Sequence, residues 1–86
     1  MKTFSLVISS PDGEIFREDV TKISLRGTLG DLAIMAGHIP FVTAVKPGDI
    51  SIEKESGDTV IASVEGGILS VSADKVNLLA GVFNWK

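Results

Sequence analysis

Residues 27–48 read GTLGDLAIMAGHIPFVTAVKPG, and this stretch decides how the chain folds. It holds four of the nine glycines, two of the three prolines and the single histidine. No charged side chain lies between Leu32 and Val45. Glycine admits backbone conformations closed to other residues, and proline fixes φ and removes a donor, so the stretch is apolar and sharply bent. It is too broken for a long helix and falls short of the roughly 20 apolar residues that span a membrane. Such a segment either closes a core or contacts a partner.

Size and composition narrow the class of protein. The chain has 86 residues, which predicts a single domain over residues 1–86. Its apolar content of 44% is typical of a packed globule, and the lack of cysteine excludes disulfides and thiolate metal sites. The net charge is −3 with no basic cluster, which argues against nucleic acid or anionic lipid as a direct ligand. The first nine residues are too short and too alternating for a signal peptide, which favours a soluble protein of the cytoplasm or an organelle matrix.

Alternating apolar and polar residues predict short β-strands along the whole chain. Turn signals at residues 11–13, 46–49, 56–58 and 72–75 separate these runs. About eight to ten strands are expected, and no segment of ten or more residues has the 3.6-residue period of a helix. The fold class is therefore all-β, a small sandwich or flattened barrel. The best-defined strands are 4–9, 14–19, 20–26, 32–34, 41–45, 50–54, 60–64, 68–71 and 76–80.

Three finer expectations concern single strands. Strict alternation resumes only at Ile23, which predicts a twist or bulge near Thr21. Residues 14–19 read as a short edge segment. The mostly apolar run 60–64 is expected to be covered on both faces.

Chemistry-bearing residues are few, and no catalytic, cofactor or metal site is predicted. His38 is the only imidazole, whereas a zinc site usually needs several His or Cys ligands, so we assign it a structural or interface role. Most of the acidic residues fall in turns or at strand ends and form no calcium-binding loop, so a solvated rim is the simpler interpretation. Gly27-Thr28-Leu29-Gly30 has the spacing of an RNA-clamping Gly-x-x-Gly loop, but Asp31 follows it where cations are needed.

Lys54 supports a rival interpretation. It lies in the segment EKESGD (residues 53–58), a lysine among acidic residues at a predicted hairpin. Lipoyl and biotinyl carrier domains are also acidic, all-β and of this size, and they are modified on such a lysine. Their usual Asp-Lys-Ala or Met-Lys-Met signature is missing here. A free-standing β adaptor with an unrelated partner is a third possibility.

The glycines and prolines of the central stretch, taken with their flanks, resemble one family over essentially all 86 residues. The pattern is that of the N-terminal β-sandwich of the ε subunit of F-type ATP synthase, which is called δ in mitochondria. That family reads Gly-x-x-Gly-x-x-Gly-Ile-x-Pro-Gly-His-x-Pro-x-x-Thr, then a Lys/Arg-Pro-Gly turn, Gly-Gly and a closing Leu-Ala-Asp strand. This sequence supplies, in order and spacing, Gly27, Gly30, Ile34, Gly37, His38, Pro40, Thr43, Pro47, Gly48, Gly66, Gly67, Leu79 and Ala80.

The resemblance implies a non-catalytic rotor component of a hetero-oligomeric complex. In the family this domain lies at the foot of the central stalk, binds the γ subunit and the loops of the membrane c-ring, and couples ion translocation to ATP synthesis. By position, the implied c-ring contact is Thr28, Leu29, Gly30, Asp31 and Leu32. The implied surface for γ and the ring is Ala36, Gly37, His38, Ile39, Pro40 and Phe41. The competing interpretation of this stretch is core closure, and we expect Ile34 and Val42 to be core in either case.

Three positions depart from the family pattern: Ala33 replaces a glycine, Ala36 a proline and Gly81 the aspartate. In the family that aspartate precedes a C-terminal helical hairpin that can block ATP hydrolysis, and no such hairpin is expected in these 86 residues. The resemblance places the protein peripherally on the cytoplasmic face of the cell membrane or its organelle equivalent, without insertion into the bilayer. It does not indicate whether H⁺ or Na⁺ is the coupled ion.

Overall fold

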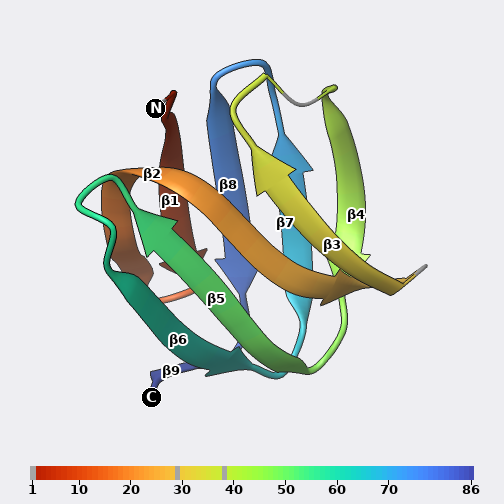
Figure 1. Ribbon diagram of the computed structural model, residues 1–86. Helices are drawn as coiled ribbons and strands as arrows, with labels where there is room; N and C mark the ends of the chain where they lie inside the picture. The colour runs from red at the N-terminus through yellow and green to blue at the C-terminus, as the bar shows by residue number, and fades with distance from the viewer. Residues whose placement is uncertain (1, 29, 38) are drawn as a thin grey trace.

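The computed structural model describes residues 2–28, 30–37 and 39–86, and within them the chain forms nine β-strands (Figure 1). This agrees with the predicted all-β class and number of strands, and no helix occurs among the described residues. The strands are β1 (Phe4–Ser10), β2 (Gly13–Gly27), β3 (Gly30–Met35), β4 (Phe41–Val45), β5 (Gly48–Lys54), β6 (Thr59–Val64), β7 (Gly67–Val71), β8 (Lys75–Ala80) and β9 (Phe83–Trp85).

The strands form two layers that share β2. One layer runs from the first half of β2 through β1, β8 and β7 to β4, and the other contains the second half of β2 with β3, β5, β6 and β9 (Figure 1). Most neighbours are antiparallel, but β1 and β8 pair in parallel. At the far end of β2, Gly27 pairs with Val45 of β4, which joins the two layers there. The result is a flattened, partly closed sandwich.

β2 changes layers at Thr21. Its pairing with β5 shifts register between Val20 and Lys22, which confirms the predicted bulge. The Thr21 hydroxyl donates to the backbone carbonyl of Glu53, at 3.1 Å, across this irregularity. Residues 14–19 pair with β1 alone and form an edge, as expected, but they are not a short element, because they belong to β2, which is continuous over 15 residues. A bulge bends a strand and increases its twist without ending it, so one strand can serve both layers.

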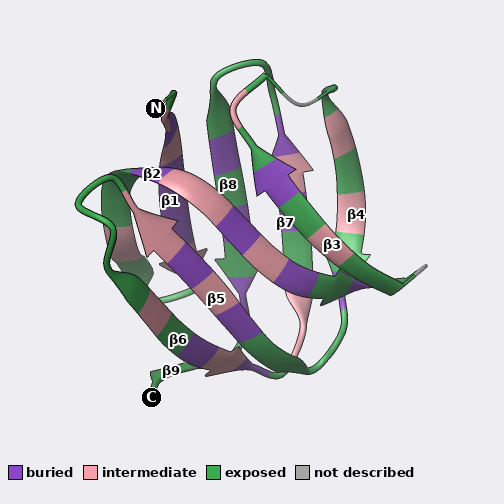
Figure 2. Cartoon of the chain, in the orientation of Figure 1, coloured by how far each residue is buried: buried purple, intermediate pink, exposed green. Residues whose placement is uncertain are grey.

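The core lies between the layers and is made by alternate residues of the strands (Figure 2). Ile34 is 1% exposed, as expected. Two expectations were wrong. Val42 is 68% exposed on β4, and β6 is not covered on both faces, because Ile61 is 44% exposed. Both strands are almost uniformly apolar, so their sequences do not distinguish the inner face from the outer one.

An aromatic cluster closes one side of the sandwich, where the first half of β2 approaches β9. The Trp85 ring lies 5.6 Å from that of Phe16 and 4.8 Å from that of Phe83, measured between centroids. The Lys54 ammonium lies 5.9 Å from the centre of the Phe16 ring. Tilted and edge-on aromatic pairs at these separations are favourable, so the cluster ties β2 of one layer to β9 of the other.

Candidate docking surfaces

The β2–β3 hairpin carries the predicted c-ring contact. Gly30 has φ +124°, which favours glycine at the position where the chain reverses into β3. Arg26 lies opposite Asp31, and the Arg26 Nε is 3.2 Å from Asp31 Oδ1. Thr28, Gly30 and Asp31 are exposed, with the Asp31 side chain at 81%, whereas Leu32 is half-buried against the core. Leu29 lies outside the described residues. The described residues of the hairpin tip therefore expose polar atoms and a carboxylate.

The loop between β3 and β4 carries the predicted surface for γ and the ring. Ala36 and Phe41 pack against the core, so these two positions serve core closure. Gly37 and Pro40 are exposed, and Ile39 is 77% exposed, the largest value among the exposed large apolar side chains. His38 lies outside the described residues. The six predicted positions thus divide between the core and the surface.

The hairpin tip and this loop lie at opposite ends of β3 (Figure 1). β3 has six residues, and a strand rises about 3.3 Å per residue, so the two sites are separated by roughly 17 Å. They are two surfaces and not one patch.

Sequence reasoning missed an apolar sheet surface beside the loop. Ala44 of β4 pairs with Ile68 of β7, and Ile68 pairs with Leu79 of β8, so these three side chains project from the same side of three neighbouring strands. Val42, two residues from Ala44, projects from that side as well. Val42, Ile68 and Leu79 are 68%, 52% and 51% exposed. We call Val42, Ala44, Ile68 and Leu79 the apolar face. The two-residue spacing of Val42 and Ala44 was a sequence signal for this face. The signal was not decisive, because β4 also has apolar residues on its other side.

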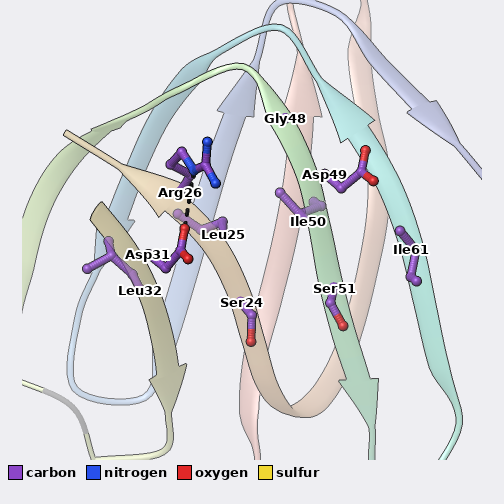
Figure 3. Close-up of a pocket in the computed structure, with 10 residues that line it drawn as sticks. All are labelled: Ser24, Leu25, Arg26, Asp31, Leu32, Gly48, Asp49, Ile50, Ser51 and Ile61. Carbon is purple, nitrogen blue, oxygen red and sulfur yellow. Dashed lines mark hydrogen bonds and ion pairs between the residues drawn. The ribbon is translucent and has the colours of Figure 1, made fainter. Parts of the chain in front are cut away.

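A shallow cleft of about 660 Å³ lies beside the hairpin tip, in the layer that contains β3, β5 and β6 (Figure 3). The β2–β5 ladder ends at the pair Ser24–Ser51, and beyond it the two strands separate. Figure 3 shows Arg26 and Asp31 on one side of the cleft and Asp49 and Ile61 on the other. Asp49 is paired with Lys86, at 3.0 Å. The charged groups beside the cleft thus compensate one another.

Two ionisable groups on the surface of β2 have shifted pKa values. The pKa of Glu14 is lowered, chiefly because its carboxylate accepts hydrogen bonds from Arg17, whose pKa is raised in turn. Both side chains are exposed surface groups of β2. No cluster of three or more potential metal ligands occurs within residues 2–28, 30–37 and 39–86. Within the same ranges no helix is long and apolar enough to cross a membrane.

Lys54 does not have the setting that the carrier interpretation requires. The tip of the β5–β6 turn is formed by the residues after it, and Lys54 itself closes the turn through its backbone bonds with Gly57 and Asp58, at 2.9 and 2.8 Å. Its side chain is 30% exposed, and its ammonium lies 3.2 Å from a Glu18 carboxylate oxygen. A lysine presented for modification extends freely into solvent, whereas this one is held against β2.

The fold defines a small all-β sandwich domain that exposes a polar hairpin on one side and an apolar sheet face on another. Residues 3–86 match the family described as ATP synthase, Delta/Epsilon chain, beta-sandwich domain, and the chain belongs to that family. The resemblance inferred from the glycine and proline pattern is therefore confirmed, and the carrier interpretation finds no support.

Known relatives agree with this assignment. The chain is 42% identical over 80 residues to the ATP synthase epsilon chain of Bacillus velezensis, and 40% identical over 80 residues to that of Bacillus pumilus. In both cases the match covers 93% of this chain and 60% of the relative, so the chain spans less than two thirds of their length.

A solved structure has the same fold. A chain in the cryo-EM structure of the Euglena gracilis mitochondrial ATP synthase, OSCP/F1/c-ring in rotational state 1, superposes with a TM-score of 0.91 at 25% identity. The match covers 96% of this chain and 53% of that one. The agreement extends across both layers of the sandwich.

Proposed function

We propose that this domain is a non-catalytic central-stalk component of an F-type ATP synthase. In this role it links the γ subunit to the loops of the membrane c-ring, turns with them, and couples ion translocation to ATP synthesis. The proposal includes a peripheral position on the cytoplasmic face of the membrane or its organelle equivalent, and a single domain over residues 1–86. Membership of the epsilon-chain family supports it.

The observation that carries the proposal is the separation of two chemically different surfaces by the length of β3. A component that joins two partners must contact both at once, so it needs two separate surfaces. The described residues of the hairpin tip are polar and include the Arg26–Asp31 ion pair, whereas the described residues of the loop and the apolar face carry no charge. Each surface therefore suits a different partner.

We assign the γ subunit to the apolar face together with residues 36–41, including His38. Permanent interfaces between subunits are more hydrophobic than transient ones. Val42, Ile68 and Leu79 each leave about half or more of their side-chain area exposed, and covering them contributes roughly 1 kcal/mol apiece. The proposed contact with γ is therefore more stable than the proposed contact with the c-ring.

We assign the c-ring loops to the hairpin tip, residues 28–32. Asp31 is exposed and already paired with Arg26 at the surface, where such a pair is worth little. A basic loop residue of the ring can therefore take the place of Arg26 at small cost. Charge pairing of this kind sets register more than affinity, which suits a contact at the edge of a rotating assembly.

Binding to purified γ subunit tests the assignment of the apolar face. The double variant Ile68→Gln/Leu79→Gln should bind γ at least tenfold more weakly, because two apolar side chains are lost from the contact. The matched control is Ile61→Gln, since Ile61 is 44% exposed on the other layer. Binding by the double variant equal to that of the control would refute the assignment.

A further inference from the structure

The strand β4 has an open edge. On one side it pairs with β7 along its whole length, from Phe41–Val71 to Val45–Gly67. On the other side its only strand partner in the described part of the chain is β2, at the single pair Gly27–Val45. Figure 1 shows β4 at the side of its layer, with β3 belonging to the opposite layer. Residues 42–44 therefore have a neighbouring strand on one side alone.

The backbone of Val42 points to that open edge. The N–H of Lys46 donates to the carbonyl of Arg26, at 2.8 Å, so the backbone groups of Lys46 face β2. Alternate residues of a strand direct their N–H and C=O to the same side. Ala44 and Val42 therefore face the same side as Lys46, with Ala44 next to the pair Gly27–Val45 and Val42 beyond it at the open edge, whereas Thr43 faces β7. No strand of the described chain pairs with Val42 on that side.

Within β4 itself this edge has no charge, proline or bulge to prevent pairing, and the nearest protective residues, Pro40 and Lys46, lie just outside the strand. Natural edge strands carry charged residues, prolines or bulges that prevent another strand from adding to them. β4 reads FVTAV, with no charge and no proline, and its register with β7 is unbroken. The outer edge at the first half of β2, by contrast, carries Glu14, Arg17 and Glu18. An edge without protection is expected where a partner strand covers it in the assembled protein.

We infer that an extended segment of the γ partner adds to β4 as a further strand, bonded through the backbone N–H and C=O of Val42. This inference rests on the proposed function and adds the mode of contact. Val42 belongs to both the open edge and the apolar face, so one partner can cover both together. A second copy of the chain paired edge to edge would leave both apolar faces in the same plane and still exposed, so the γ partner is the better occupant.

Two substitutions at Val42 separate main-chain pairing from side-chain contact. Val42→Pro keeps an apolar side chain of three carbons and deletes the N–H, whereas Val42→Ala shortens the side chain and keeps the N–H. Strand addition predicts that Val42→Pro binds purified γ about tenfold more weakly than Val42→Ala. Docking through side chains alone predicts the opposite order, and Val42→Pro binding as tightly as Val42→Ala would overturn the inference. If the unaltered chain fails to bind γ at all, the proposed function fails instead.

Hydrogen exchange of the unaltered chain gives a second test that needs no variant. The Thr43 amide should exchange slowly both in the free chain and in the complex with γ, because it faces β7. The Val42 amide should exchange fast in the free chain and at least tenfold more slowly in the complex. Equal exchange of Val42 in both states would contradict strand addition. Sedimentation of the free chain as a dimer that Val42→Pro dissociates would likewise overturn it, in favour of a second copy.

Discussion

Gly67 lies at the start of β7, opposite Ala80 of β8. A Cβ at this position would collide with the backbone carbonyl oxygen of Leu79, which cannot move as a flexible side chain can. We predict that Gly67→Ala lowers the free energy of unfolding by about 3 kcal/mol, the upper range for inserting a group into a packed site. Urea unfolding followed by the fluorescence of the single tryptophan measures it.

Gly81→Ala is the matched control for this prediction. A Cβ at Gly81 would meet no atom within 4 Å, and the backbone there is not left-handed, so alanine should change stability by less than about 0.5 kcal/mol. An equal loss of unfolding free energy in the two variants would show that the close approach of Gly67 to the Leu79 carbonyl is not the reason for glycine at that position.

The ion pair of Glu14 and Arg17 gives a prediction about pH. The pKa of Glu14 is depressed in the folded chain, below its ordinary value of 4.5, so its contribution to stability is present above the unfolded pKa. That contribution is lost as the pH falls through the folded pKa. We expect Arg17→Met to raise the Glu14 pKa towards 4.5, read from its side-chain NMR shift, with little change in stability at neutral pH. An unchanged Glu14 titration in the variant would contradict the assigned cause.

At the scale of the element, the bulge in β2 determines how one strand serves two layers. Thr21→Val removes the hydroxyl that donates to the Glu53 carbonyl while keeping the shape of the side chain. We predict a loss of about 1 kcal/mol in the free energy of unfolding, measured by urea titration with an unchanged slope. Thr59→Val, at an exposed position of β6, should be neutral within about 0.5 kcal/mol. A neutral Thr21→Val would show that the hydrogen bond does not support the bulge.

Strand existence could be predicted from the sequence, and strand pairing could not. Alternation and turn residues located most of the strands and even the irregularity at Thr21, because both leave local signals, but β9 was not predicted. The parallel pairing of β1 with β8 joins residues about 70 positions apart, and no local sequence signal near either strand indicates it. The continuity of β2 was missed for the same reason. Its two halves pair with different strands, β1 and β5, and no turn lies between them.

The candidate site was predictable in part. The glycine and proline pattern identified the hairpin tip and the loop, because turns need particular residue types. Within the loop, Ala36 and Phe41 pack on the core, which depends on tertiary packing. The apolar face was missed, and Val42 was wrongly placed in the core, because β4 has apolar residues on both sides and its sequence does not distinguish an outward one from an inward one. The assignment of residues 28–32 and 36–41 to partners stays a prediction.

At the scale of the whole molecule, the arrangement of surfaces predicts that the domain acts as a physical link. Added to ATP synthase membranes depleted of their epsilon chain, the 86-residue chain should restore ATP synthesis driven by the ion gradient, if the proposed function holds. Ile68→Gln/Leu79→Gln should restore much less at equal concentration, because its contact with γ is weakened. Full restoration by this variant would show that the apolar face is not needed for coupling.

A cross-link from position 31 in the assembled complex shows most directly whether the domain docks on the ring. The chain has no cysteine, so Asp31→Cys introduces a unique thiol, and its exposed pair with Arg26 contributes little to folding. Asp58→Cys, in the β5–β6 turn, is the control. We predict that the complex runs intact on native separation and that Asp31→Cys, but not Asp58→Cys, forms a product with the small ring subunit. A chain that runs apart from the complex, or a ring product from position 58 alone, would contradict the proposed role.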